Sequence, residues 1–97
     1  MEVAPASASV SGNGASEVLH TVNIPPGETW LVAVVGAGST SASGSYLPQI
    51  RIGDAATPQN SGHFAAAAIM SESGDVVFIS LSGGSSSFTG HVYTVKM

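Results

Sequence analysis

Apolar and polar residues alternate along most of this chain, and a period of two is typical of β-strands with one wet face. Clusters of Gly, Pro, Asn and Ser interrupt the alternation at short intervals and predict turns. The pattern therefore predicts an all-β fold, an antiparallel β-sandwich of jelly-roll-like form with about seven or eight short strands. The main strands are expected at 17–24, 29–35, 46–52, 63–70, 76–81 and 88–96.

The longest unbroken apolar run is 29–35, which contains the only Trp of the chain, Trp30. The turn signal Pro25-Pro26-Gly27-Glu28 precedes it, and a Gly/Ser-rich tract at 37–45, expected to be a mobile loop, follows it. Apolar side chains occupy both the odd and the even positions of this strand, so we expect both of its faces to be covered. One face would meet the core of the domain, and the other a second sheet, an arm or another subunit.

The segment 63–70 is open to two interpretations. Its four consecutive alanines favour a helix. A helix of so few residues is marginal in water, however, and every neighbouring segment has the pattern of a strand. We therefore expect a strand here.

The first fifteen residues, 1–15, have the small and polar composition of a flexible arm, and the sandwich domain is expected at 16–97. Ala6, Ala8 and Val10 alternate with serines, as in a strand added to the edge of a sheet. That sheet could be the chain's own or that of a neighbour. We expect an arm that crosses to a neighbouring copy.

Charge is sparse. Only two residues are Lys or Arg and six are Asp or Glu, which gives a formal net charge of −4. A typical soluble domain is about a quarter charged, so much of this surface is expected to be covered by other protein. The alternative is an ordinary Ser/Gly-rich domain that is soluble through its hydroxyls. The residues expected at an interface are Val3, Ala6, Ala8, Val10, Trp30, Val32 and Val34.

Composition also argues against several classes of function. Arg51 and Lys96 are the only cations, so there is no basic patch to neutralise nucleic-acid phosphates. No apolar run approaches the ~18 residues of a membrane span, and the start of the chain does not resemble a signal peptide. The chain contains no Cys, which fits synthesis in the cytoplasm.

His20, His63 and His91 are the candidates for a zinc site. They are widely separated and lack the short spacings of metal-binding pairs, so no metal or cofactor is expected. Alternation over 17–24 places His20 on the same face as Val18 and Val22, which indicates a buried or interface histidine.

The acidic residues and the glycines give no catalytic pattern. Asp54 and Asp75 each lie beside a glycine and read as turn residues and not as calcium ligands. Glu28 could pair with Asp75 or Glu72 as in a glycosidase, but no spacing supports it. Gly36-Ala37-Gly38 follows a strand but lacks the third glycine and the helix of a dinucleotide loop. No catalytic residue is expected, and the chain is predicted not to be an enzyme.

The aromatic residues could form a platform that stacks against sugars. Most of them alternate with polar neighbours in strands, which favours a role in the core or at a subunit interface. These residues are Trp30, Tyr46, Phe64, Phe78, Phe88 and Tyr93.

Two stretches resemble known families. The first is the closing part of the chain, which resembles the last two strands of jelly rolls related to tumour necrosis factor and C1q. The residues that carry this resemblance are Gly74-Asp75-Val76-Val77-Phe78-Ile79 and Ser87-Phe88-Thr89-Gly90-His91-Val92. Val22-Asn23-Ile24-Pro25-Pro26-Gly27-Glu28-Thr29-Trp30 resembles hairpins of β modules in tailed-phage virions, such as head-decoration (cement) proteins and tail-fibre domains. Both resemblances imply a trimeric habit.

The sequence thus predicts a structural virion protein, a head-decoration protein that stabilises the capsid as a homotrimer bound to the major capsid protein or another virion protein. The alternative is a carbohydrate- or receptor-binding tip module of a tail fibre, which would need exposed aromatic residues in the loops 37–45 or 54–62. Those loops contain none.

Overall fold

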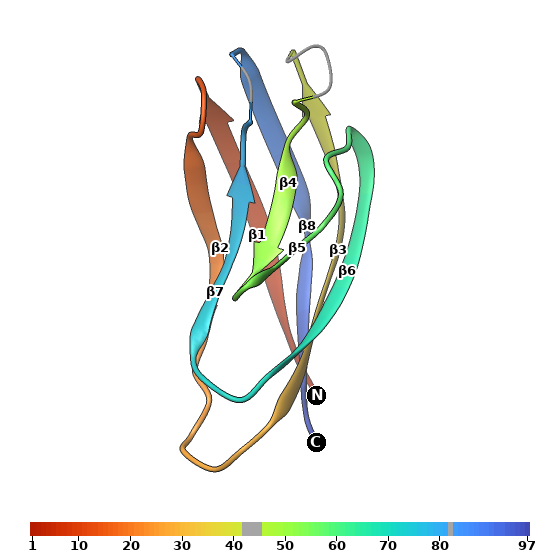
Figure 1. The fold of residues 1–97 in the computed structure, drawn as a ribbon. Coiled ribbons are helices and arrows are strands. Elements are labelled where there is room, and N and C mark those ends of the chain that lie inside the picture. Colours follow the sequence, from red (N-terminus) through yellow and green to blue (C-terminus); the bar gives the residue numbers. More distant parts are fainter. Residues whose placement is uncertain (42–45, 82) are drawn as a thin grey trace.

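The fold is a sandwich of two four-stranded antiparallel sheets, as the alternation predicted (Figure 1). This computed structural model describes residues 1–41, 46–81 and 83–97, which contain no helix. The body is elongated, with extents of 41 × 19 × 17 Å. Its strands are β1 (Glu2–Ser11), β2 (Ser16–Val22), β3 (Trp30–Thr40), β4 (Gln49–Ile52), β5 (Ala55–Ala56), β6 (Gly62–Met70), β7 (Gly74–Ile79) and β8 (Ser85–Lys96).

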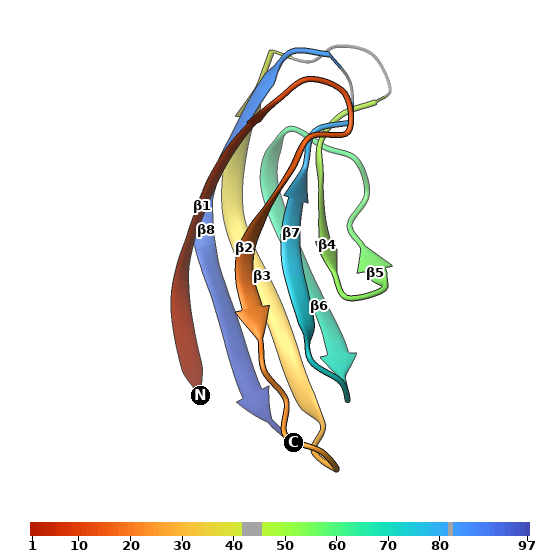
Figure 2. The same ribbon diagram turned by 90° about the vertical axis from the view of Figure 1, so that its left-hand side faces the viewer.

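The strands pair in a nested order, in which β1 joins β8, β2 joins β7, β3 joins β6 and β4 joins β5. Successive pairs alternate between the two sheets. Sheet A has the order β1-β8-β3-β6, and sheet B has the order β2-β7-β4-β5. A long hairpin rolled across two layers in this way is a jelly roll. Figure 2 shows the two layers facing each other.

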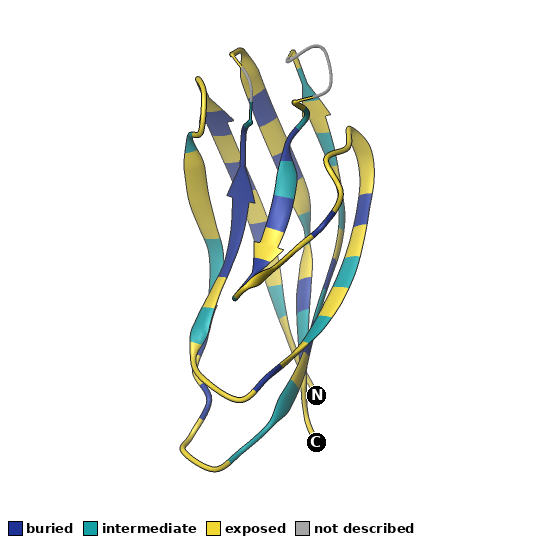
Figure 3. Ribbon diagram, viewed as in Figure 1, coloured by how far each residue is buried: buried dark blue, intermediate teal, exposed yellow. Residues whose placement is uncertain are grey.

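The core lies between the sheets and is centred on three phenylalanines. The ring of Phe64 meets the rings of Phe78 and Phe88 edge-on, with centroids 6.2 and 5.8 Å apart. Phe78 and Phe88 have centroids 5.6 Å apart. Valines and isoleucines of both sheets surround them. From Phe64 to Met70 of β6, buried or half-buried residues alternate with exposed ones, and Figure 3 shows this alternation along the ribbon. Only every second side chain is therefore directed to the core.

The strand expected at 63–70 is present as β6, and the helical alternative is excluded. Pairing with β3 over the full length of β6 outweighs the helix propensity of its four alanines. The turn at Pro25–Glu28 is also confirmed. The Glu28 N–H donates to Pro25 O at 3.1 Å, and Gly27 has a φ of 83°. Proline followed by a glycine with positive φ is the pattern of a type II turn.

Several predicted boundaries are wrong because tertiary pairing overrides composition. The expected loop at 37–45 is strand as far as Thr40, since β3 continues to pair with β8 up to Thr40 opposite Ser86. Residues 42–45 lie outside the described residues. The turn expected at 83–87 is shorter than predicted, because β8 begins at Ser85 and includes the serines of this segment. The strand expected at 46–52 begins only at Gln49, after the buried Pro48.

A β-bulge in β2 corrects the predicted facing of this strand. The register with β7 shifts between Val18 and His20, so Val18 pairs with Val77 and His20 pairs with Val76. An extra residue reverses the alternation of side chains between the two faces. His20 and Val22 therefore share the inner side, whereas Val18 points outward.

The first residues of the chain contribute an edge strand to the domain's own sheet. β1 pairs with β8 over ten residues, from Glu2 opposite Thr94 to Ser11 opposite Ser85. Gly12 and Gly14 then turn the chain with positive φ angles. Exchange of β1 with a neighbouring copy stays a prediction.

Candidate interaction surface

Side chains of sheet A point to one face of the sheet or the other according to whether their residue numbers are even or odd. The register aligns even with even and odd with odd positions across all four strands. Even-numbered residues such as Val34, Phe64 and Val92 are buried between the sheets. The odd-numbered residues of β1, β3, β6 and β8 point the other way, and together they form the surface that we call the outer face of sheet A.

The outer face of sheet A carries no charged side chain over the four strands, all of which are fully described. The acidic and basic residues of the chain lie in sheet B, in turns, or at even-numbered positions at the ends of β1 and β8. They are Glu2, Glu17, Glu28, Arg51, Asp54, Glu72, Asp75 and Lys96. A face of this size without any charged side chain is unusual, because exposed sheet faces normally carry several charged residues.

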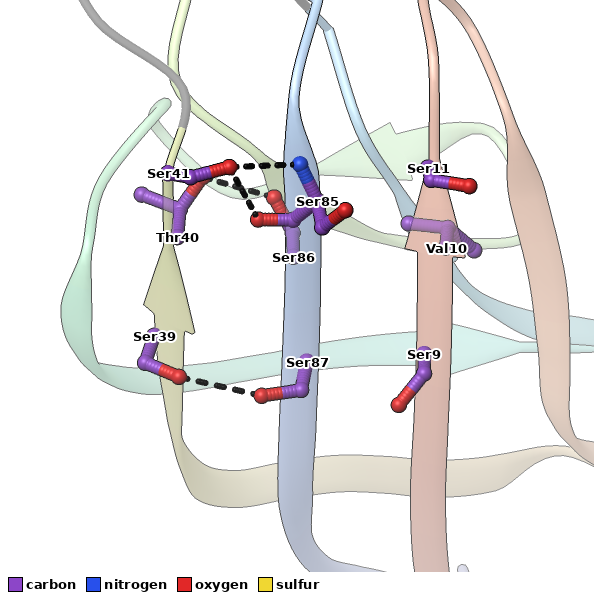
Figure 4. A pocket seen from close by; sticks show the side chains of 9 residues that line it. All are labelled: Ser9, Val10, Ser11, Ser39, Thr40, Ser41, Ser85, Ser86 and Ser87. Carbon is purple, nitrogen blue, oxygen red and sulfur yellow. Dashed lines mark hydrogen bonds between the residues drawn. The ribbon is translucent and has the colours of Figure 1, made fainter.

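One end of the outer face is rich in hydroxyl groups that bind one another (Figure 4). Ser39 Oγ and Ser87 Oγ are 3.0 Å apart. The Ser85 N–H donates to Ser41 Oγ at 2.7 Å, and Ser41 Oγ donates back to Ser85 O at 3.2 Å. These bonds hold the ends of β3 and β8 together.

The serine-rich end forms an open depression that Val10 and Thr40 also line. None of the described residues that line it is a His, Asp, Glu or Lys that would activate a serine as a nucleophile.

The other end of the outer face is mainly apolar, although Tyr93 and His91 also lie there, opposite Ala33 and Val35. Its five large apolar residues are between 37% (Leu31) and 63% (Ile69) exposed, and they are Val3, Leu31, Val35, Ile69 and Val95. They make up more than half of the exposed large apolar residues in the described part of the chain. The alanines of β3 and β6 lie among them and keep the surface flat. Large exposed apolar patches of this kind mark sites of contact with other protein.

The expected interface residues fall on both sides of sheet A. Ala6, Ala8, Val10, Val32 and Val34 have even numbers and are buried in the domain's own core. Only Val3 belongs to the outer face. Trp30 is half-buried at the end of β3, where its Nε1–H donates to Glu28 Oε1 at 3.1 Å.

The expected residues thus lie on two strands of the outer face, β1 and β3, but most of them occupy the buried, even-numbered positions. The strand at 29–35 has apolar residues on both faces. Alternation alone therefore could not identify which of its faces is the outer one. The charge-free odd positions become visible only after the four strands are aligned in register.

The candidate chemical groups do not converge. Among the described residues, no group of three or more His, Cys, Asp or Glu side chains is arranged to hold a metal ion. Asp75 Oδ1 accepts a hydrogen bond from Thr21 Oγ1 at 2.8 Å, and Glu28 Oε1 lies 3.6 Å from Lys96 Nζ. These contacts give both carboxylates a structural role. Within the described ranges, no helix is long and apolar enough to cross a membrane.

The aromatic residues form no common platform. Phe64, Phe78 and Phe88 are buried in the core. Tyr93 lies on the outer face beside His91, with ring centroids 6.3 Å apart. Tyr46 is exposed and lies in the segment before β4, outside the strands. Comparison with known proteins found no matching family model, no matching curated protein and no matching solved structure.

Proposed function

We propose that this chain is a non-enzymatic structural protein that assembles by packing the outer face of sheet A against neighbouring copies of itself. The observation that carries the proposal is a four-stranded sheet face without charge, in a chain whose eight charged residues all lie elsewhere. A partner that covers this face must itself be free of charge, because burying an unpaired charge is costly. Neighbouring copies that turn this face toward one another meet that requirement.

The size of the face is adequate for a stable contact. Four strands spaced about 4.8 Å apart, with about ten residues rising about 3.4 Å each, cover roughly 650 Å². Two such faces together bury roughly 1,300 Å², which is within the range of specific protein–protein interfaces. The valines, Leu31 and Ile69 supply the apolar area, and the serine-rich end supplies hydrogen-bonding groups at the rim.

Within this class, we propose a head-decoration protein of a tailed-phage virion, made in the host cytoplasm and bound to the major capsid protein as a homotrimer. The resemblance of the Pro25–Glu28 hairpin to virion modules supports the setting, and the resemblance of the closing strands supports the trimer. A protein that binds only the assembled shell stabilises that shell by its binding free energy, repeated over many sites.

Co-sedimentation with the shell tests the virion role. The chain is expected to pellet with the assembled shell of its capsid protein and to remain in solution with the unassembled subunits. Contacts that lack charge are little screened, so raising the salt concentration should leave the pelleted fraction unchanged. Equal binding to shells and subunits, or none to either, would contradict the decoration role.

A further inference from the structure

Each four-stranded sheet has two edges, and three of these four edges carry features that discourage pairing with another strand. β5, at one edge of sheet B, is only two residues long. β2, at the other edge, contains the bulge after Val18 and the charged Glu17. β1, at one edge of sheet A, contains Pro5, and its Ser9 N–H donates to Glu17 Oε2 at 3.1 Å. Proline removes one edge donor and Glu17 occupies another.

β6, at the remaining edge of sheet A, has none of these features. It is nine residues long and contains no charged residue and no proline. It pairs with β3 in one unbroken register from Gly62 opposite Gly38 to Met70 opposite Trp30. A long, uncharged edge strand without proline or bulge is the type of edge that accepts a further strand.

Hydrogen bonds across sheet A show which backbone groups of β6 are free. The Ser41 N–H donates to Ser85 O at 2.8 Å, and the Met97 N–H donates to Thr29 O at 2.9 Å. Bonds along an antiparallel strand alternate between its two neighbours, so odd-numbered residues of β3 bond to β8 and even-numbered ones bond to β6. Odd-numbered residues of β6, which oppose odd-numbered residues of β3, therefore direct their N–H and C=O groups to the free edge.

The one capped group on this edge agrees with that assignment. Asn60 Nδ2 donates to His63 O at 3.0 Å, from outside the sheet. The N–H and C=O groups of Ala65, Ala67 and Ile69 face outward with no partner among the described residues.

We propose that β6 pairs antiparallel with β6 of a second copy, about a two-fold axis at Ala67. In this register Ala67 faces its own counterpart and Ala65 faces Ile69, so the three residues with free backbone groups are the ones that hydrogen-bond across the seam. The axis is perpendicular to the sheet. The two sheets A therefore join into one continuous sheet, with both outer faces on the same side.

The edge itself indicates a second copy as the occupant. A strand added here must place its side chains beside the alanines of β6 and extend a surface without charge. β6 satisfies both conditions toward itself, since no like charges oppose each other in a self-pair. Pairing also doubles the charge-free outer face. This pairing involves the edge of sheet A and not its outer face, so it can form whether or not the outer face is covered as the proposed function requires.

Disulfide cross-linking tests the register, and the chain is suited to it because it contains no Cys. Directly opposed residues that exchange hydrogen bonds have Cα atoms about 5.5 Å apart, which a disulfide can span. Ala67→Cys alone is expected to form a covalent dimer on mild oxidation. Ala65→Cys alone is not, whereas an equimolar mixture of Ala65→Cys and Ile69→Cys is. No link in Ala67→Cys, or equal linking in all variants, would overturn the proposal.

A proline pair tests the hydrogen bonds. Ala65→Pro removes an N–H at the free edge of β6, and Ser7→Pro removes one at the free edge of β1, so neither disturbs the bonds within sheet A. Ala65→Pro is expected to weaken β6 pairing by roughly tenfold or more, seen as loss of the cross-link when combined with Ala67→Cys. Ser7→Pro in the same background should keep it. Retention of the cross-link in both would overturn the proposal, and circular dichroism verifies that both variants are folded.

Discussion

Gly36 and Gly90 oppose each other across β3 and β8, and the ring of Phe88 lies against both. A Cβ on Gly36 would lie 2.5 Å from Phe88 Cζ, and a Cβ on Gly90 would lie 2.7 Å from Gly36 Cα and 2.8 Å from Phe88 Cζ. No side chain fits at either position. The Phe88-Thr89-Gly90 step thus has a packing reason, because the phenylalanine needs a glycine two residues on to make room for its ring.

Gly90→Ala is expected to destabilise the fold by about 1–3 kcal/mol or more, because the added methyl group overfills a packed core. For a domain of this size, each kcal/mol lowers Tm by about 4–8 °C. Thermal unfolding followed by circular dichroism measures the change. Gly83→Ala is the control, since a Cβ there meets nothing within 4 Å. Equal Tm values for the two variants would refute the packing argument.

A buried side-chain hydrogen bond holds the segment after β5 against β4. The buried N–H of Ile50 donates to Thr57 Oγ1 at 3.0 Å. Thr57→Val keeps the shape of the side chain but leaves this N–H without its acceptor, so we expect a loss of about 1–3 kcal/mol in the free energy of unfolding. Urea denaturation measures it. Thr89→Val, on the exposed outer face, should change stability by less than about 0.5 kcal/mol, and a comparable loss in both would refute this role for Thr57.

A lysine on the outer face should break the assembly without unfolding the chain. Val35 lies near the centre of that face and is 43% exposed, so Val35→Lys would place an unpaired charge in the contact. Val18, which is 49% exposed on sheet B, offers the matched control Val18→Lys. Sedimentation velocity is expected to show particles no larger than the pair joined through β6 for Val35→Lys, and unchanged oligomers for Val18→Lys. Dissociation of both, or of neither, would exclude the outer face as the contact.

Much of the fold could be predicted from alternation because most strands have one wet face. β6 was recognisable in spite of its alanines, since its neighbours all read as strands. β5 could not be found, because two alanines have no period. The bulge after Val18 was hidden for a similar reason, since it depends on how β2 pairs with β7 and not on the residues of β2 alone.

The candidate site was harder to predict than the fold. The sequence showed that the chain is short of charge and that 29–35 is apolar on both faces. Which face was inside depended on how the phenylalanines of β6, β7 and β8 form one core cluster with Val32 and Val34. That arrangement is tertiary, and so the outer residues Leu31 and Val35 were passed over.

The central claim is that neighbouring copies cover the outer face of sheet A, and the molar mass of the wild-type chain in solution tests it most directly. Size-exclusion chromatography with light scattering is expected to give a multiple of the 9.6 kDa chain mass above the twofold that β6 pairing alone produces, at least threefold for the proposed trimer. A particle of 9.6 kDa that stays monomeric at the highest concentration reached would contradict the claim.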